Sequence, residues 1–291
     1  MDFHDVLTLM RPRQWTKNLV VFAAIIFSAN LFSGPMLLRV VVAFVALCLV
    51  SSGLYAMNDA ADADYDREHP VKRERPVASG RVSRQQAVII AVVLVGLGVG
   101  VSVLLGLPFL AAVAGYLTIQ VLYTMYLKHV VIADMLTIAA GFVIKAVAGA
   151  LVISVPVSPW LILCTGLLAL FLAAAKRRHE IVLLRERSGG HRPVLSEYSA
   201  ELLDSFMVTL SAATITSYAL YTFFEAKAPR YGMMLTIPFV IYGVLRYQFL
   251  VLRKEGGGRP EEILLADRPI LACIGAWIVC AIAVLYAGRF F

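Results

Sequence analysis

Three aspartates at the end of an apolar run have the spacing of a metal site. In the stretch LYAMNDAADADYDREHP, a helix turning about 100° per residue brings Asp59, Asp62 and Asp66 within about 60° of one another. Asp64 points to the opposite side of this helix. The shared face also carries Tyr55 and Asn58. The spacing predicts one face rich in oxygen ligands and one aspartate that does not belong to it.

Carboxylates this close together repel one another, and a hard cation relieves the repulsion. Mg²⁺ prefers carboxylate and carbonyl oxygens, keeps several waters and usually bridges to the phosphates of a substrate. We therefore predict a Mg²⁺ site in which the three aspartates are catalytic. Its expected ligands are Asn58, Asp59, Asp62 and Asp66. The alternative is a solvated helix end whose acids pair with Lys72, Arg73 and Arg75.

Basic side chains stand at the other expected helix ends. They are Lys17 in RPRQWTKN, Lys128 in YLKHVVIAD, and Lys176 and Arg177 in KRRHE. Glu180 follows Lys176 by four residues, so these two can pair on one helix face. Positive groups without a matching cluster of acids suit phosphates that are bound directly rather than through a metal.

Lys145 lies inside an apolar run, where a charged side chain is costly and indicates a functional site by default. It stands eleven residues beyond Asp134 at nearly the same helical angle, roughly 16 Å deeper along a straight helix. The alternative is a lysine that pairs with an acid of another helix.

The composition is that of a polytopic membrane protein. The chain has 291 residues, of which 60% are hydrophobic and 15% charged, with a mean hydropathy of +0.81. Soluble domains carry about 45–50% apolar and about 25% charged residues. This excludes soluble globules, disordered chains and disulfide scaffolds. The four cysteines all lie in apolar runs and are interpreted as buried hydrophobic side chains.

Nine apolar runs are long enough to serve as spans once polar ends are added, which predicts an all-α bundle of nine transmembrane helices. They lie near Leu19–Phe32, Leu37–Met57, Ala87–Leu105, Phe109–Met125, Val131–Ile153, Trp160–Ala175, Phe206–Phe224, Tyr231–Leu252 and Ile270–Ala287.

The distribution of charge predicts the orientation. Most of the 26 Lys and Arg residues fall on one side, in the N-terminal segment and the loops after the second, fourth, sixth and eighth runs. The other side holds Arg39, Lys227, Arg230 and Arg289, while Lys145 and Arg246 lie within spans. Because positive loops stay inside, we expect a multi-pass protein of the plasma (inner) membrane with a cytoplasmic N-terminus and an outer C-terminus. Arg11 and Arg13 are interpreted as orientation signals, and the net charge of +7 as topology rather than nucleic-acid binding.

The motif NDAADADYD resembles the N-D-x-x-D-x-x-x-D motif of the UbiA superfamily of intramembrane prenyltransferases, and RPVASGRVS resembles the segment that follows it there. The resemblance covers nearly the whole chain. It implies a UbiA-like bundle in which residues 1–291 form one transferase domain. Residues 1–16 are expected at the membrane interface, and residues 60–86 and 176–204 in cytoplasmic loops that cap the active site.

One branch of the superfamily fits better than the others. Prenyltransferases carry a second acidic pair after the fourth helix, but here Ile138 stands four residues after Asp134 and lysines lie nearby. The combined motifs are similar to the decaprenyl-phosphate phosphoribosyltransferases. That resemblance implies Mg²⁺-dependent transfer of 5-phosphoribose from phosphoribosyl pyrophosphate to decaprenyl (polyprenyl) phosphate. The products are decaprenylphosphoryl-5-phosphoribose and pyrophosphate, in an early step of arabinose-donor synthesis for the cell wall.

The resemblance also implies roles for the polar residues. The expected donor-binding residues are Lys17, Tyr55, Asn58, Lys72, Arg75, Arg81 and Lys128. The expected lipid-phosphate-binding residues are Lys17, Lys128, Asp134, Lys145, Lys176, Arg177 and Glu180. The polyprenyl tail is expected in a lateral groove that is open to lipid.

Two other functions stay open at this point. An aromatic prenyltransferase that uses a prenyl diphosphate has the same expected fold and metal. A cation transporter would use the acidic face as an ion site, but nearly all ionisable residues cluster at one interface. Apolar helices exposed to the bilayer permit a homo-oligomer without specifying one.

Overall fold

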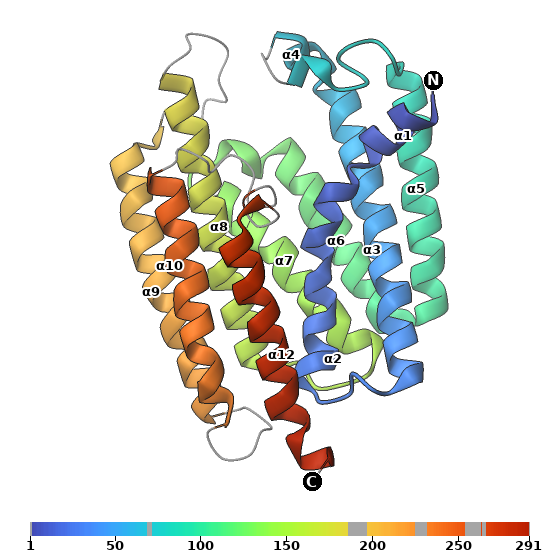
Figure 1. Ribbon diagram of the computed structural model, residues 1–291. Helices are drawn as coiled ribbons and strands as arrows, with labels where there is room; N and C mark the ends of the chain where they lie inside the picture. Colours follow the sequence, from blue (N-terminus) through green and yellow to red (C-terminus); the bar gives the residue numbers. More distant parts are fainter. Residues whose placement is uncertain are drawn as a thin grey trace.

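The computed structural model describes residues 2–68, 72–185, 197–224, 232–253, 263 and 266–290, and regular secondary structure in these ranges is entirely helical. Figure 1 shows the helices as one bundle with roughly parallel axes. The elements are α1 (Phe3–Met10), η1 (Pro12–Phe22), α2 (Ala23–Phe27), α3 (Gly34–Ala61), α4 (Ala63–Glu68), η2 (Lys72–Glu74), α5 (Arg84–Leu105), α6 (Leu107–Met125), η3 (Leu127–His129), α7 (Ala133–Val152), α8 (Pro159–Arg185), α9 (Ala200–Phe224), η5 (Gly232–Thr236), α10 (Ile237–Arg253) and α12 (Arg268–Phe290).

Eight helical segments in the described ranges are long and apolar enough to cross a membrane. They are α3, α5, α6, α7, α8, α9, η5 with α10, and α12. The first predicted span, 19–32, is not among them, because its chain forms the 3₁₀ helix η1 followed by the short helix α2. A 3₁₀ helix rises about 2.0 Å per residue, so η1 and α2 together still extend for about 30 Å. The count of nine spans stays a prediction.

Several helices extend past their apolar runs. α3 continues from the predicted end at Met57 to Ala61, and α8 continues from Ala175 to Arg185. In α8 the added turns contain Glu180, which pairs with both Lys176 and Arg177 and thereby stabilises the polar part of the helix. In Figure 1, α1, α4 and the polar end of α8 lie at one end of the bundle, and the C-terminus lies at the other.

Glycines allow the closest helix contacts. A Cβ atom at Gly53 of α3 would lie 2.8 Å from the carbonyl oxygen of Ala91 in α5. At Gly98 of α5 it would lie 3.0 Å from the carbonyl oxygen of Ala46 in α3. Small residues let two helices approach closely inside a membrane, so α3 and α5 are locked together at two points.

The 3₁₀ helix η1 packs directly on α7. A Cβ atom at Gly149 would lie 2.1 Å from the carbonyl oxygen of Val21, so only glycine permits this contact. At the C-terminal end of α7, Arg39 donates to the carbonyl oxygens of Val152 and Leu105, at 2.7 and 2.8 Å, and thereby caps α7 and α5.

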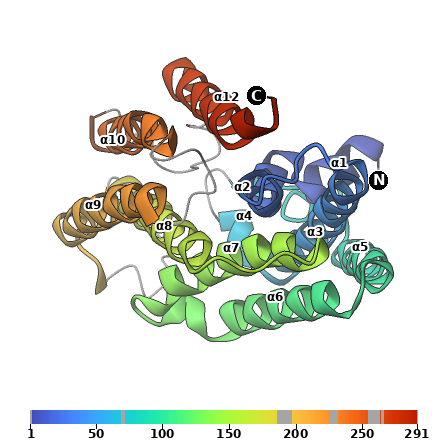
Figure 2. The ribbon, with the colours of Figure 1, turned by 90° about the horizontal axis from the view of Figure 1, so that it is seen from below.

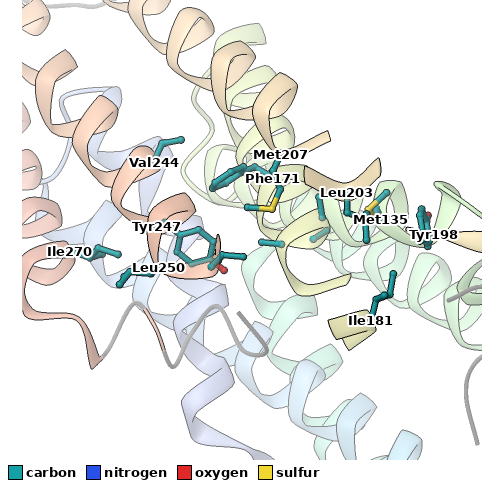
Figure 3. Close-up of a cluster of buried hydrophobic side chains, with 14 residues drawn as sticks. Met135, Phe171, Ile181, Tyr198, Leu203, Met207, Val244, Tyr247, Leu250 and Ile270 are labelled. Carbon is teal, nitrogen blue, oxygen red and sulfur yellow. The ribbon is translucent and has the colours of Figure 1, made fainter. Parts of the chain in front are cut away.

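Helix α7 lies between the two halves of the bundle, as Figure 2 shows. One apolar cluster joins it to α8, α9, α10 and α12, and its members include Met135, Phe171, Met207, Tyr247 and Ile270 (Figure 3). Another cluster joins the deeper part of α7 to η1, α3 and α6. Helix α7 therefore holds its polar residues at the boundary between these two packed units.

Candidate active site

The acidic motif spans a helix break. α3 ends at Ala61, Asp62 has φ −90° and ψ 7°, and the short helix α4 follows. The continuous helix assumed from the sequence is therefore wrong at this point. The backbone N–H of Asp62 still donates to Asn58, and that of Asp66 to Asp62, so the helical phase is largely kept. Asp59 and Asp66 consequently converge, as the spacing predicted.

A single nitrogen of Arg75 bridges the two convergent carboxylates. Arg75 Nη1 lies 3.1 Å from Oδ1 of Asp59 and 2.6 Å from Oδ2 of Asp66. Lys72 Nζ lies 4.0 Å from the other oxygen of Asp66. Both aspartates are buried, so these basic groups offset the cost of holding two carboxylates away from water. The pairing with Lys72 and Arg75 that we gave as the alternative to a metal is thus present.

Arg11 joins this cluster from the N-terminal segment. Its Nη2 donates to Oδ1 of Asp59 at 2.5 Å, and its guanidinium lies 5.2 Å from the centre of the Tyr55 ring. Arg11 has φ 53° and ψ 62°, in the left-handed region, where the chain turns from α1 into η1. Burial lowers the pKa of Arg11, while the charge of Asp59 opposes that shift. The sequence reading missed this residue because it interpreted Arg11 only as an orientation signal.

Of the remaining members of the motif, Asp64 lies where its spacing predicted. The side-chain oxygen of Asn58 accepts a hydrogen bond from Thr124 of α6 at 3.3 Å. Asp62 is half-buried at the helix break. Asp64 faces away from the cluster, is exposed, and pairs with Arg67 and Arg84. The hydrogen bond from Arg84 lowers the pKa of Asp64.

The donor set fits a hard cation with few protein ligands. In the described ranges no group of three or more His, Cys, Asp or Glu side chains is arranged to enclose a metal. Two carboxylates nevertheless meet at one positive nitrogen of Arg75, where a cation interacts with both. Oxygen ligands from one side suit Mg²⁺, which completes its shell with water and substrate phosphate.

The loop that follows α4 is tied to α1. Arg81 Nε donates to Asp5 at 3.0 Å, and its Nη2 donates to the carbonyl oxygen of Glu74 at 2.8 Å. The hydrogen bond from Arg81 lowers the pKa of Asp5. Leu9 of α1 is fully buried in a small apolar cluster that contains Ala60 and Val77. Of the expected donor-binding residues in this loop, Arg75 and Lys72 therefore face the acids, and Arg81 holds the N-terminal segment.

A second cluster surrounds Asp134 at the start of α7. Arg177 Nε donates to Asp134 at 2.5 Å, and both side chains are fully buried. Arg177 also donates to Glu180 at 2.5 Å and to the hydroxyl of Tyr123 at 3.1 Å. The hydroxyl of Tyr198 donates to Asp134 at 2.8 Å and accepts the backbone N–H of Ile132. This closed network favours a structural role for Asp134 and Arg177 over contact with a phosphate.

The predicted phosphate-binding lysines take different positions. Lys17 of η1 and Lys176 of α8 are close enough for their charges to interact, although they belong to different halves of the bundle. Lys128 is half-buried in η3. Lys145 is buried in α7, and its ammonium lies 4.4 Å from the centre of the Tyr116 ring. The sequence expected these lysines at one polar interface, except for the deeper Lys145.

An apolar cavity of about 750 Å³ lies among α2, α8, α9, α10 and α12. Its wall includes Phe27, Leu168, Phe171, Tyr218, Tyr247 and Trp277. The cavity has the character of a site for a hydrocarbon chain, because apolar and aromatic groups dominate its wall.

A sequence profile of the UbiA prenyltransferase family matches residues 19–261. The chain belongs to this family. The decaprenyl-phosphate phosphoribosyltransferase of Mycobacterium tuberculosis is 36% identical over 298 residues, which cover 97% of this chain and 95% of the relative. The protein of the same name from Corynebacterium glutamicum is 33% identical over 290 residues, covering 97% and 86%.

Solved structures agree with the membership in the UbiA family. A UbiA homolog from Archaeoglobus fulgidus bound to GPP and Mg²⁺ has a TM-score of 0.75 at 20% identity, covering 97% of this chain and 99% of that one. The resemblance inferred from NDAADADYD and the all-helical UbiA fold are thereby confirmed.

Proposed function

We propose that this UbiA family member transfers 5-phosphoribose from phosphoribosyl pyrophosphate to decaprenyl (polyprenyl) phosphate and releases pyrophosphate. The observation that carries the proposal is the likeness, over nearly the whole chain, to relatives named decaprenyl-phosphate phosphoribosyltransferase. The second site supports it, because Ile138 packs in an apolar cluster and Asp134 is bound by Arg177. The position four residues after Asp134 thus supplies no second acid for a prenyl diphosphate.

Asn58, Asp59, Asp62 and Asp66 are the proposed Mg²⁺ ligands, and Asp59, Asp62 and Asp66 the catalytic aspartates. Mg²⁺ bound there supplies neutralisation of the charge that develops on the leaving pyrophosphate. The family supports this assignment, since an archaeal UbiA homolog was crystallised with Mg²⁺.

The chain's own residues hold and orient the donor. Arg75 and Lys72 lie beside the acids and are positioned to bind the oxygens of the pyrophosphate. The Tyr55 ring lies against the guanidinium of Arg11, which pairs with Asp59. Tyr55 is proposed to orient the ribose. Lys128 is proposed to bind the remaining donor phosphate, and Arg81 to fix the N-terminal segment over the site. Catalysis then rests on positioning and electrostatics, because the acceptor phosphate is already an anion at pH 7.

The acceptor approaches from the membrane. Lys17 and Lys176 carry like charges close together, and an anion between them relieves their repulsion. They are the proposed ligands of the lipid phosphate at the mouth of the site, with Glu180 holding Lys176. The polyprenyl tail is proposed to occupy the apolar cavity. The whole chain acts as one domain of a plasma-membrane protein, and its polar end with the acids faces the cytoplasm.

Two substrate pairs test this proposal on the purified protein in detergent with Mg²⁺. One reaction contains radiolabelled phosphoribosyl pyrophosphate and decaprenyl phosphate, and the other contains a prenyl diphosphate and 4-hydroxybenzoate. We expect label in the lipid phase in the first reaction alone, and none after addition of EDTA. A prenylated aromatic product would instead show an aromatic prenyltransferase. If neither reaction gives a product, cation transport becomes the favoured alternative.

A further inference from the structure

Lys145 is a buried cation without a carboxylate partner in the part of the chain that the structure describes. Its side chain is 5% exposed, in the middle of a helix that is apolar enough to span a membrane. None of the ion pairs among the described residues includes it, so the alternative of a lysine paired with an acid of another helix is not borne out in these ranges. A charge at this depth is costly and is retained where it serves a function.

The groups around Lys145 are neutral hydrogen-bonding side chains. The Tyr116 hydroxyl accepts a hydrogen bond from Gln120 at 3.0 Å and lies 3.4 Å from Ser51 Oγ. Ser51 also lies 3.4 Å from Asn18, on η1. These side chains come from α6, α3 and η1 and converge on one buried point. They provide hydroxyl and amide donors for an anion, and none of them is a carboxylate.

A polar line connects this point with the acidic cluster. Tyr116, Gln120 and Thr124 follow one another at intervals of four residues on one face of α6, and Thr124 donates to Asn58. Eight residues of α-helix rise about 12 Å, which sets the depth of Lys145 below the acids.

On the α7 side, a glycine faces the Tyr116 ring. Gly141 lies one turn nearer the polar end, and a Cβ atom there would lie 3.5 Å from the Tyr116 ring. An alanine at this position would therefore make ordinary contact with the ring, and a larger side chain would have to displace it.

We propose that Lys145 and Tyr116 form a subsite for the phosphate group of the lipid acceptor, and that this subsite selects a monophosphate as the attacking group. The inference rests on the proposed function. When one face of C1 carries the leaving group, a single displacement brings the attacking oxygen to the opposite face. With the pyrophosphate at the acids, the attacking phosphate lies deeper, on the side of Lys145. Lys17 and Lys176 then guide the lipid headgroup in, and Lys145 holds it during transfer.

Equilibrium binding to the full chain in detergent tests the subsite without turnover. The probes are farnesyl phosphate, farnesol, and phosphoribosyl pyrophosphate with Mg²⁺, each titrated alone. The variants are Lys145→Met, which keeps the bulk without the charge, and Lys145→Arg, which keeps the charge. Arg253→Met is the matched control, because this exposed residue at the end of α10 lies outside the site.

We expect Lys145→Met to weaken the binding of farnesyl phosphate by about 10- to 100-fold, the effect of losing a hydrogen bond to a charged group. Farnesol and phosphoribosyl pyrophosphate should bind within about twofold of the wild type. Lys145→Arg should retain part of the phosphate affinity, and Arg253→Met all of it. The melting temperature of Lys145→Met should be unchanged or higher, because an unpaired buried charge has been removed.

Four results would overturn the subsite. Unchanged binding of farnesyl phosphate to Lys145→Met would make the lysine structural, as would a lower melting temperature. A loss confined to phosphoribosyl pyrophosphate would assign Lys145 to the donor phosphate instead. If the wild type binds neither phosphate compound, the proposed function itself fails, and the subsite fails with it.

Discussion

Two aspartate–arginine clusters lie on either side of the polar end of this bundle, and they differ in how tightly they are enclosed. At the end of α3, Arg11 and Arg75 hold Asp59, and their side chains are 26% and 27% exposed. At the start of α7, Arg177 holds Asp134, and both side chains are 0% exposed. The first pair of arginines comes from a turn and a loop, whereas the second arginine belongs to a long helix.

This difference distinguishes a ligand-binding site from a structural contact between helices. Arginines on short segments can leave their carboxylates when a ligand offers stronger partners, so the α3 cluster is suited to binding. In the α7 cluster, Tyr123 and Glu180 accept further hydrogen bonds from Arg177, and Tyr198 donates to Asp134. This buried, hydrogen-bonded pair fixes α7 to α8, which favours a structural role over binding of a substrate.

The largest expected effect lies in the α3 cluster. Asp62→Ala and Asp66→Ala should each lower kcat by roughly a thousandfold or more, since the metal contributes several kcal/mol to the transition state. The melting temperature should stay close to that of the wild type. Initial rates of phosphoribosyl transfer and a thermal unfolding curve measure the two quantities. Rates within tenfold of the wild type would remove these residues from the metal site.

In the α7 cluster the main effect should fall on stability. Arg177→Met leaves Asp134 buried and unpaired, which should cost about 3–5 kcal/mol of unfolding free energy. The double variant Arg177→Met with Asp134→Leu should recover most of that loss, because no charge is then left unpaired. Thermal unfolding in detergent checks both. A stable Arg177→Met protein that has lost acceptor binding would instead make Arg177 a ligand.

The same cluster predicts a dependence on alkaline pH. Burial raises the pKa of Tyr198 to about 12, and the hydrogen bond to Asp134 acts in the same direction. A phenol with an ordinary pKa near 10 in the unfolded chain loses its proton there first. Stability should therefore fall between about pH 10 and 12, by about 1.4 kcal/mol per pH unit from this group. The comparison is with Tyr198→Phe, which should lack this component; identical profiles would contradict the assignment.

Competition between Arg75 and the metal should give a smaller effect. Arg75→Gln removes the cation between Asp59 and Asp66, so Mg²⁺ should bind the substrate-free protein about fivefold more tightly by simple electrostatics. Isothermal titration with Mg²⁺ measures this, with Arg67→Gln as the control for a lost charge nearby. Weaker Mg²⁺ binding would mean that Arg75 positions the ligands instead of competing with the metal.

The smallest effect is expected at Asp64, which is exposed and faces away from the cluster. Asp64→Ala should change kcat by no more than about twofold, because exposed ion pairs contribute little. Its lowered pKa means that the small stabilisation by Arg84 is present at neutral pH and is lost as the pH falls. Equal losses of rate at Asp62, Asp64 and Asp66 would contradict the one-face geometry.

Much of the α3 cluster could be predicted because helical periodicity is local. The spacing of Asp59, Asp66 and Asp64 was enough to bring two together and direct the third away, even across the break at Asp62. The helix break itself was not predicted, since the residues around it have no proline or glycine.

The partners of these residues could not be read from the sequence. Arg11 meets Asp59 across 48 residues, and Arg177 meets Asp134 across 43. Such contacts depend on how whole helices pack, and no local pattern records them. For the same reason the spacing of Lys145 predicted its depth but not its contact with Tyr116. The first predicted span is not among the long apolar helices. A 3₁₀ helix covers the same length with fewer residues than the α-helix that the prediction assumed.

The two glycine contacts between α3 and α5 limit the motions that this enzyme can make. Because backbone meets backbone at Gly53 and Gly98, neither helix can roll or slide against the other without a collision. The two helices therefore behave as one rigid unit that carries the acids at its end. We expect substrate exchange to use α1 and the loop through Arg75 and Arg81. These segments are held to the helix pair and to each other by side chains, at Asp59, at Asp5 and in the apolar cluster around Leu9. The rate of product release should accordingly be set by these segments, while the α3–α5 pair stays rigid through each turnover.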